Sequence, residues 1–117
     1  MAVREVAFIM YPVREMERAL AFYRDALGLE PAGLASEVWS EFDIAGTTFG
    51  IGIFAQLGSP GSAGALALEI DDLPAMRARL LALGIEVSEP YETPICWISQ
   101  LHDPDGNTVT LHQRKAT

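Results

Sequence analysis

Cysteine is nearly missing from this 117-residue chain, because Cys96 is its only example. A single cysteine excludes an intrachain disulfide, and disulfide frameworks are typical of small secreted domains. The chain also lacks an apolar run of membrane-spanning length, and the apolar stretch that ends at Pro12 lacks the small-residue cleavage site of a signal peptide. We therefore expect a cytoplasmic protein that does not cross a membrane.

Basic residues are scarce as well. The chain has 8 lysines and arginines against 16 aspartates and glutamates, which gives a formal net charge of -8 at pH 7. An acidic surface repels phosphate, so nucleic acid and anionic membranes are poor partners for this protein. The same charge favours a cationic ligand, although it also serves plain solubility.

The length and the composition predict one folded domain over residues 1–117. Hydrophobic residues make up 50% of the chain, and no long structureless tract interrupts it. A chain of this size buries a modest but real hydrophobic core. This is the composition of a globular domain and not of a disordered one.

The first half of the chain predicts the order strand, helix and three strands. The expected elements are a buried strand over 3–11, a helix over 14–26, and strands over 29–35, 38–44 and 47–54. Gly28 stands where a helix C-terminal cap belongs.

The same order returns after a linker over 56–64 that is rich in Gly, Ser and Pro. We expect a strand over 65–71 and a helix that begins near Pro74 and ends at Gly84. A short strand over 87–90, a longer one over 95–102 and a last strand over 108–112 follow. The segment Asp103-Pro104-Asp105-Gly106-Asn107 predicts the last turn.

The two halves therefore predict an internal repeat, with module one over 1–55 and module two over 65–117. Leu27-Gly28 matches Leu83-Gly84 after the helices, and Ala45-Gly46 matches Asp105-Gly106 in the last hairpins. Repetition of this kind decides the architecture. We predict an α+β fold in which two βαβββ modules form curved mixed sheets around a cavity.

Two motifs carry a resemblance to a known family. The first motif is Met16-Glu17-Arg18-Ala19-Leu20-Ala21-Phe22-Tyr23, which leads to Leu27-Gly28-Leu29 and resembles the first helix of the vicinal oxygen chelate superfamily. The second motif is Asp103 to Asn107, which resembles the last hairpin of that superfamily. That superfamily contains glyoxalase I, extradiol dioxygenases, and fosfomycin- and bleomycin-resistance proteins. The resemblance covers nearly the whole chain. It implies the paired βαβββ fold and a homodimer.

The family resemblance also indicates where a metal site would lie, and this chain lacks the expected ligands at those positions. Metal-using members hold the ion with His, Glu or Gln side chains, and the matching positions here are Phe8, Gly50 or Gly52, Ala65 and Thr110. Phe, Gly and Ala have no metal-binding side chain, and Thr is a weak neutral ligand. We expect no metal and no other cofactor, and hence neither glyoxalase-like isomerisation nor metal-dependent ring cleavage.

Other possible metal donors do not form a chelating motif. Cys96, His102, His112, Glu41 and Asp43 have none of the tight spacings of a known metal site. We expect Cys96 to be a buried small residue and His102, at the start of the last turn, to be exposed.

Strand alternation and the matched positions predict the residues on the concave face. This face combines aromatic and small residues with a carboxylate, a hydroxyl and an imidazole, which suits a small organic ligand. The predicted ligand-binding residues are Phe8, Met10, Trp39, Glu41, Gly50, Gly52, Ala65, Ala67, Thr110 and His112.

Each of these residues also has a purely structural explanation. Trp39 can belong to the core, Glu41 can face solvent, and Phe8 and Met10 can fill a collapsed cavity. The glycines can serve sheet curvature alone.

Three functions follow from this pattern. The first is a metal-free small-molecule-binding protein, like the bleomycin-binding resistance proteins, with a cationic aromatic ligand. The second is a lyase, isomerase or dioxygenase-like enzyme that acts on a small carbonyl or aromatic compound with Glu41 or His112 as general base. The third is an interaction domain with a vestigial cavity. We favour the first.

Overall fold

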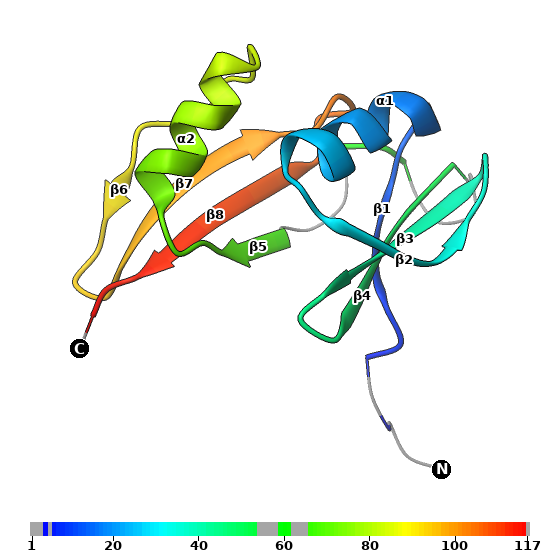
Figure 1. The fold of residues 1–117 in the computed structure, drawn as a ribbon, viewed down its shortest axis with the longest axis horizontal. Helices are drawn as coiled ribbons and strands as arrows, with labels where there is room; N and C mark the ends of the chain where they lie inside the picture. Colours follow the sequence, from blue (N-terminus) through cyan, green and yellow to red (C-terminus); the bar gives the residue numbers. More distant parts are fainter. Residues whose placement is uncertain (1–3, 5, 54–58, 62–65, 117) are drawn as a thin grey trace.

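The computed structural model describes residues 4, 6–53, 59–61 and 66–116, and its elements occur in the predicted order (Figure 1). The first module contains β1 (Ile9–Pro12), α1 (Met16–Leu20), a π-helical continuation η1 (Ala21–Ala26), β2 (Glu30–Ala35), β3 (Trp39–Ile44) and β4 (Thr47–Gly52). The second contains β5 (Leu66–Glu69), α2 (Leu73–Ala82), β6 (Tyr91–Glu92), β7 (Cys96–His102) and β8 (Thr108–Arg114).

The two modules repeat each other in topology. The first sheet has the strand order β1-β4-β3-β2, and the second has the order β5-β8-β7-β6. In both sheets the first strand is parallel to the last, and the remaining pairs are antiparallel. Each sheet carries its own helix on one face, and the modules lie side by side (Figure 1). The predicted α+β fold with two βαβββ modules is confirmed.

Both helices end at the glycines that the sequence indicates. Gly28 has φ +76° and Gly84 has φ +80°, a left-handed conformation that glycine adopts without steric cost. At its start, α2 is capped by the Asp72 carboxylate, which accepts a hydrogen bond of 3.0 Å from the Ala75 backbone N–H. None of the described helices is long and apolar enough to cross a membrane.

Three predicted segments need correction or lie outside the described residues. The strand predicted over 87–90 is wrong, because residues 85–90 form no strand and β6 is a two-residue strand beyond Pro90. The Arg77 guanidinium donates to the Ser88 carbonyl, so a side chain takes the place of a ladder partner there. The first strand begins at Ile9 instead of residue 3. Most of the linker over 56–64 lies outside the described residues.

The core runs without interruption from one module into the other. Tyr11, Tyr23 and Phe49 are almost completely buried, and their rings contact one another at centroid distances of 5.6 Å (Tyr11 and Phe49) and 5.2 Å (Tyr23 and Phe49). Leu68 and Val109 of the second module belong to the same buried cluster. Burial of this shared apolar surface stabilises the two modules as one unit.

The predicted turn over 103–107 is confirmed, and it is also the polar joint between the modules. The buried Asp103 carboxylate accepts four hydrogen bonds. They come from the Tyr23 hydroxyl (2.8 Å), the Asn107 side-chain amide (2.8 Å), and the backbone N–H groups of Asp105 (2.9 Å) and Asn107 (2.8 Å). A buried carboxylate is stable only with such a full set of donors.

Further bonds join this turn to the first module. The Asn107 side chain donates to the Pro12 carbonyl at 2.9 Å, and Arg14 and Arg18 each contact Oδ1 of Asp105 at 3.0 Å. The Tyr11 hydroxyl donates to the Thr108 carbonyl at 2.7 Å. The joint therefore fixes how the second module sits on the first.

Alkaline pH is expected to weaken this joint. Burial, and then the Asp103 carboxylate, raise the pKa of Tyr23 above its ordinary value of 10.0. The unfolded chain releases this proton near pH 10 while the folded chain retains it, so the stability contribution is present below that pH and is lost above it. We expect the free energy of unfolding to fall more steeply above pH 10 in the wild type than in Tyr23→Phe.

Urea denaturation at a series of pH values measures this slope. Burial also raises the pKa of Tyr11, so part of the slope remains in the Tyr23 variant. Tyr91→Phe is the matched control, because Tyr91 is exposed. Equal slopes in the wild type and Tyr23→Phe would contradict the assignment of the buried proton to Tyr23.

Candidate functional site

The open face of the first sheet carries most of the predicted site residues. Strand alternation places Phe42 and Phe49 in the core and turns Trp39 and Glu41 to the opposite face. In the sheet register Trp39 lies beside Gly52, and Glu41 lies beside Gly50, which is also the neighbour of Met10. This face is therefore built by β1, β3 and β4 together.

The indole ring of Trp39 lies against the backbone of Gly50 and Gly52. A Cβ atom on Gly50 would lie 2.5 Å from Cζ2 of Trp39, and one on Gly52 would lie 2.6 Å from Cε3. Neither glycine has a positive φ, so close approach and not backbone conformation requires glycine here. The room left by these glycines holds the tryptophan ring.

The Glu41 carboxylate holds this ring in place. Oε2 accepts a hydrogen bond of 2.8 Å from Nε1 of Trp39, and Oε1 accepts one of 3.2 Å from the Leu34 backbone N–H. One carboxylate thus joins the ring on β3 to the irregular strand β2, whose pairing with β3 is interrupted between Pro31 and Ala35.

A groove of about 520 Å³ lies over this tryptophan. Phe8 forms one wall, with its ring edge-to-face to Trp39 at a centroid distance of 5.4 Å. Apolar side chains dominate the surface, and Phe8 (45%) and Leu34 (67%) are strongly exposed. The described lining residues all belong to module one: Phe8, Leu34, Ala35, Ser36, Val38, Trp39 and Glu41.

A second hollow of about 480 Å³ adjoins the groove at Ser36. Its floor is formed by Met16 and Leu20, and its rim carries the carboxylates of Glu15, Glu17 and Glu37. The surroundings of the groove are therefore acidic.

Sequence reasoning found Phe8, Trp39 and Glu41 but missed the rest of the groove. Leu34 and Ala35 lie at the end of β2, and Ser36 follows that strand, in a segment with no alternation to follow. Val38 is 38% exposed and lines the groove just before β3 begins.

Three further predicted residues, Ala67, Thr110 and His112, lie on the open face of the second sheet and do not line the groove. Ala67 is the neighbour of Thr110, whose Oγ1 accepts a hydrogen bond of 3.3 Å from the Gln100 side chain. His112 Nδ1 lies 2.6 Å from Oε1 of Glu69, a residue that sequence reasoning did not select. Ala65 lies outside the described residues.

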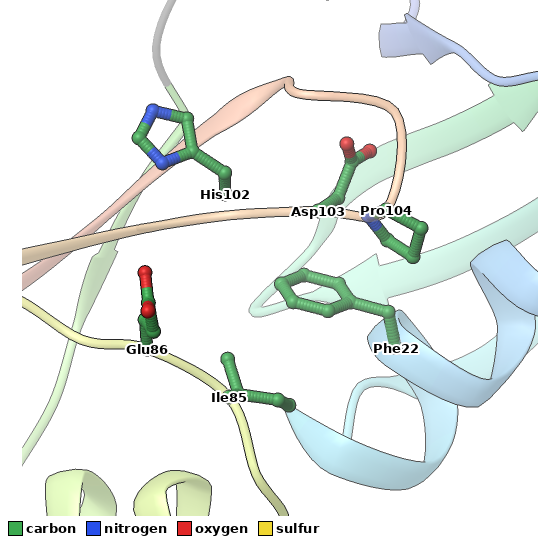
Figure 2. Close-up of a pocket in the computed structure, with 6 residues that line it drawn as sticks. All are labelled: Phe22, Ile85, Glu86, His102, Asp103 and Pro104. Carbon is green, nitrogen blue, oxygen red and sulfur yellow. The ribbon is translucent and has the colours of Figure 1, made fainter.

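Figure 2 shows a different hollow, of about 320 Å³, on the helix side of the molecule. Phe22 and Pro104 lie at one end of it, and His102 and Glu86 lie at the other, with Ile85 between them. His102 is exposed, as predicted. None of the residues predicted to bind a ligand lines this hollow, and the Asp103 carboxylate at its edge is already bonded to Tyr23 and Asn107.

Cys96 is buried, as predicted, with 4% of its surface exposed. Its Sγ lies 3.0 Å from the Thr93 hydroxyl, which also accepts from the Cys96 backbone N–H. These contacts close the turn before β7 and leave the thiol within the packed interior.

The fold and the groove define a two-module α+β protein with an apolar site on the open face of one sheet. The profile of the Glyoxalase/Bleomycin resistance protein/Dioxygenase superfamily matches residues 5–111, and the chain belongs to this family. No curated protein sequence matches the chain significantly.

Solved structures of similar proteins agree with this assignment. The chain is 31% identical to TnmS3, an antibiotic binding protein from Streptomyces sp. CB03234, with 98% of this chain and 99% of that chain covered and a TM-score of 0.83. A glyoxalase/bleomycin resistance protein from the same organism is 29% identical, with 91% and 99% covered and a TM-score of 0.75. The fosfomycin resistance protein FosX from Listeria monocytogenes is 20% identical, with 96% and 94% covered and a TM-score of 0.75, and shares the fold.

At the described positions that the family resemblance matched, the residues offer weak metal ligands or none. Among the four matched positions, Phe8 offers a phenyl ring, and Gly50 and Gly52 have no side chain and lie beneath Trp39. Thr110 is on the other sheet and accepts from Gln100. Within the described part of the chain, no three His, Cys, Asp or Glu side chains come together as a metal-binding group.

Proposed function

We propose that the protein binds a planar, positively charged aromatic compound in the groove over Trp39, without the metal of the family. The observation that carries this proposal is the tryptophan ring itself, laid on two glycines and tied down by Glu41. A fixed indole face beside an aromatic edge is a stacking surface that is organised before the ligand arrives.

The groove has the size and chemistry of a small-molecule site. Its volume of about 520 Å³ falls in the usual range for such sites, and its walls are mainly apolar with a few polar groups. The groove is open, whereas a vestigial cavity would be packed solid. A cation over an indole face gains further attraction, and the nearby rim of Glu15, Glu17 and Glu37 adds to it.

The similarity to TnmS3 supports a binding function. TnmS3 is described as an antibiotic binding protein, and it matches this chain over nearly its whole length. We therefore infer that this chain also binds a small organic molecule of the antibiotic type.

Absence of metal ligands directs the proposal toward binding. Because Phe8 and the two glycines offer no donor, this chain gives no means to hold the family's ion at that place. An enzyme of the lyase, isomerase or dioxygenase-like kind would need a base, and Glu41 is engaged by Trp39 and Leu34 through both oxygens. His112 is the remaining candidate.

We further propose that two copies of the chain associate in the cytoplasm. The open faces of both sheets expose apolar side chains, among them Leu34 (67%) on the first and Tyr91 (69%) on the second. Exposed apolar surface of this kind marks an interaction site. Analytical ultracentrifugation tests this, with a dimer expected and a monomer at all concentrations contradicting it.

A tryptophan-quenching titration tests the binding function. Trp97→Phe leaves Trp39 as the only fluorescent indole, and acriflavine serves as the planar cation. We expect saturable quenching by acriflavine and weaker quenching by acridone, a neutral ring system of similar size. A failure of both compounds to quench Trp39 would contradict the proposal.

Glu41 is expected to act by positioning Trp39. Glu41→Gln leaves one amide oxygen where two carboxylate oxygens accepted hydrogen bonds, so we expect affinity for acriflavine to fall by about threefold to tenfold. Asp43→Asn, an exposed neighbour on the same strand face, is the control. Unchanged affinity in Glu41→Gln would contradict this role.

A further inference from the structure

The open face of the second sheet holds a carboxylate–imidazole pair away from the groove. Glu69 on β5 and His112 on β8 are neighbours in the parallel register, and Nδ1 of His112 lies 2.6 Å from Oε1 of Glu69. The other carboxylate oxygen accepts a hydrogen bond of 2.7 Å from the Arg114 backbone N–H. Both oxygens of the Glu69 carboxylate are therefore held by groups of β8.

This geometry decides which nitrogen of His112 carries the proton. The Arg114 backbone N–H, and then His112, lower the pKa of the Glu69 carboxyl below its ordinary value. An ionised carboxylate only accepts hydrogen bonds, so Nδ1 of His112 is the donor. In the neutral ring, Nε2 then carries a free lone pair and acts as a hydrogen-bond acceptor.

The imidazole is partly exposed on this open face, with 30% of the His112 side-chain surface accessible. On the same face, Ala67 stands two residues before Glu69 on β5 and has a small side chain, and Ile98 lies opposite His112 on β7. Thr110 and Gln100 continue the face as a pair of hydrogen-bonding groups. Helix α2 covers the opposite face, where Leu68 and Leu111 are buried. Among the described residues, the charged groups that act on the Glu69 carboxylate are His112 and Arg114.

We propose that Glu69 and His112 form a proton-accepting dyad that binds the acidic hydroxyl group of a phenol or enol. The O–H bond of the ligand breaks, and its proton forms an N–H bond at Nε2 of His112. The resulting phenolate or enolate pairs with the imidazolium, whose other N–H remains bonded to the Glu69 carboxylate. The step transfers one proton and needs no oxidant, reductant or further reactant.

The proposed proton transfer to His112 takes place on the second sheet and does not depend on ligand binding in the groove over Trp39. Glu69 acts through His112 and is a positioning residue, whereas His112 touches the ligand. A carboxylate that orients an imidazole and stabilises its protonated form is an established arrangement in proton-transfer sites.

The experiment uses 4-nitrophenol, whose phenolate absorbs visible light and whose phenol does not. Protein is added at a fixed pH at which the free probe is mostly protonated. We expect the phenolate absorbance to rise with protein concentration and saturate. No rise at protein concentrations up to the solubility limit would overturn the proposal.

Variants assign the effect to the dyad. We expect His112→Gln to abolish the rise and Glu69→Gln to weaken the binding of the phenolate by about tenfold, as for loss of a charge-assisted hydrogen bond. His102→Gln is the matched control, because His102 and His112 are the only histidines of the chain. A rise that survives His112→Gln would overturn the proposal.

Two further measurements test whether the phenolate signal is independent of the groove over Trp39 and whether Nε2 of His112 is the proton acceptor. Trp39→Ala is expected to leave the phenolate rise intact, so failure of the groove proposal and failure of the dyad are distinguishable. Nitrogen NMR of the unliganded protein is expected to show the Nδ1–H form for neutral His112. The Nε2–H form would contradict the assigned acceptor.

Discussion

Gly50→Ala is expected to displace the Trp39 ring from the sheet and to lose most of the binding of an aromatic cation. The added methyl group would lie 2.5 Å from Cζ2 of Trp39, and only the side chain can move away. Gly50 does not have a positive φ, so alanine suits the backbone and the clash accounts for the whole effect. We expect affinity to fall by about tenfold or more.

Fluorescence in the Trp97→Phe background measures both parts of this prediction. The Trp39 emission is expected to shift, and acriflavine quenching to weaken, while the free energy of unfolding changes by only about 1 kcal/mol. Thr48→Ala, two residues earlier on β4 and on the same face, is expected to change neither signal. Wild-type affinity in Gly50→Ala would show that the stacking surface over Trp39 is not the binding site.

Asp103→Ala is expected to lower the free energy of unfolding by about 3–5 kcal/mol, a large loss for a single substitution. It removes the acceptor of four hydrogen bonds and leaves the Tyr23 hydroxyl and the Asn107 amide buried with fewer partners. An unsatisfied buried donor costs more than the bond itself contributes. The substitution therefore weakens the polar joint that attaches the second module to the first.

Urea denaturation measures this loss, and Asp43→Ala is the matched control. Asp43 precedes the corresponding turn of module one, is exposed, and accepts a hydrogen bond of 3.2 Å from the Gly46 backbone N–H. We expect Asp43→Ala to lower the free energy of unfolding by about 1 kcal/mol or less. If the two variants lose similar stability, the polar joint does not hold the modules together.

The repeat could be predicted from the sequence because its signals are local. Each signal depends only on residues that are close in sequence. The helices are indicated by the spacing of apolar residues before Gly28 and Gly84, and the hairpins by the turn residues Ala45-Gly46 and Asp105-Gly106. The prediction of a strand over 87–90 was wrong, and a local pattern could not show the contact of Arg77 with the Ser88 carbonyl, because Arg77 belongs to a different element.

The site was harder to predict because it depends on contacts between strands. Trp39 and Glu41 could be placed on one face by alternation, but their bond to each other and the glycines beneath the ring depend on the register of β3 and β4. Glu69 was missed because its contact with His112 spans 43 residues of sequence. The turn at Asp103 was expected from its residue types, whereas its burial depends on Tyr23 in the other module.

Acriflavine titration of chelator-treated, desalted protein tests the central claim most directly. Calorimetry follows the binding, and elemental analysis of the same sample follows the metal content after exposure to Zn, Ni, Mn, Fe and Mg. We expect saturable binding that depends on Trp39 and is the same with and without added metal. A tightly held metal in each chain, with binding only in its presence, would contradict it.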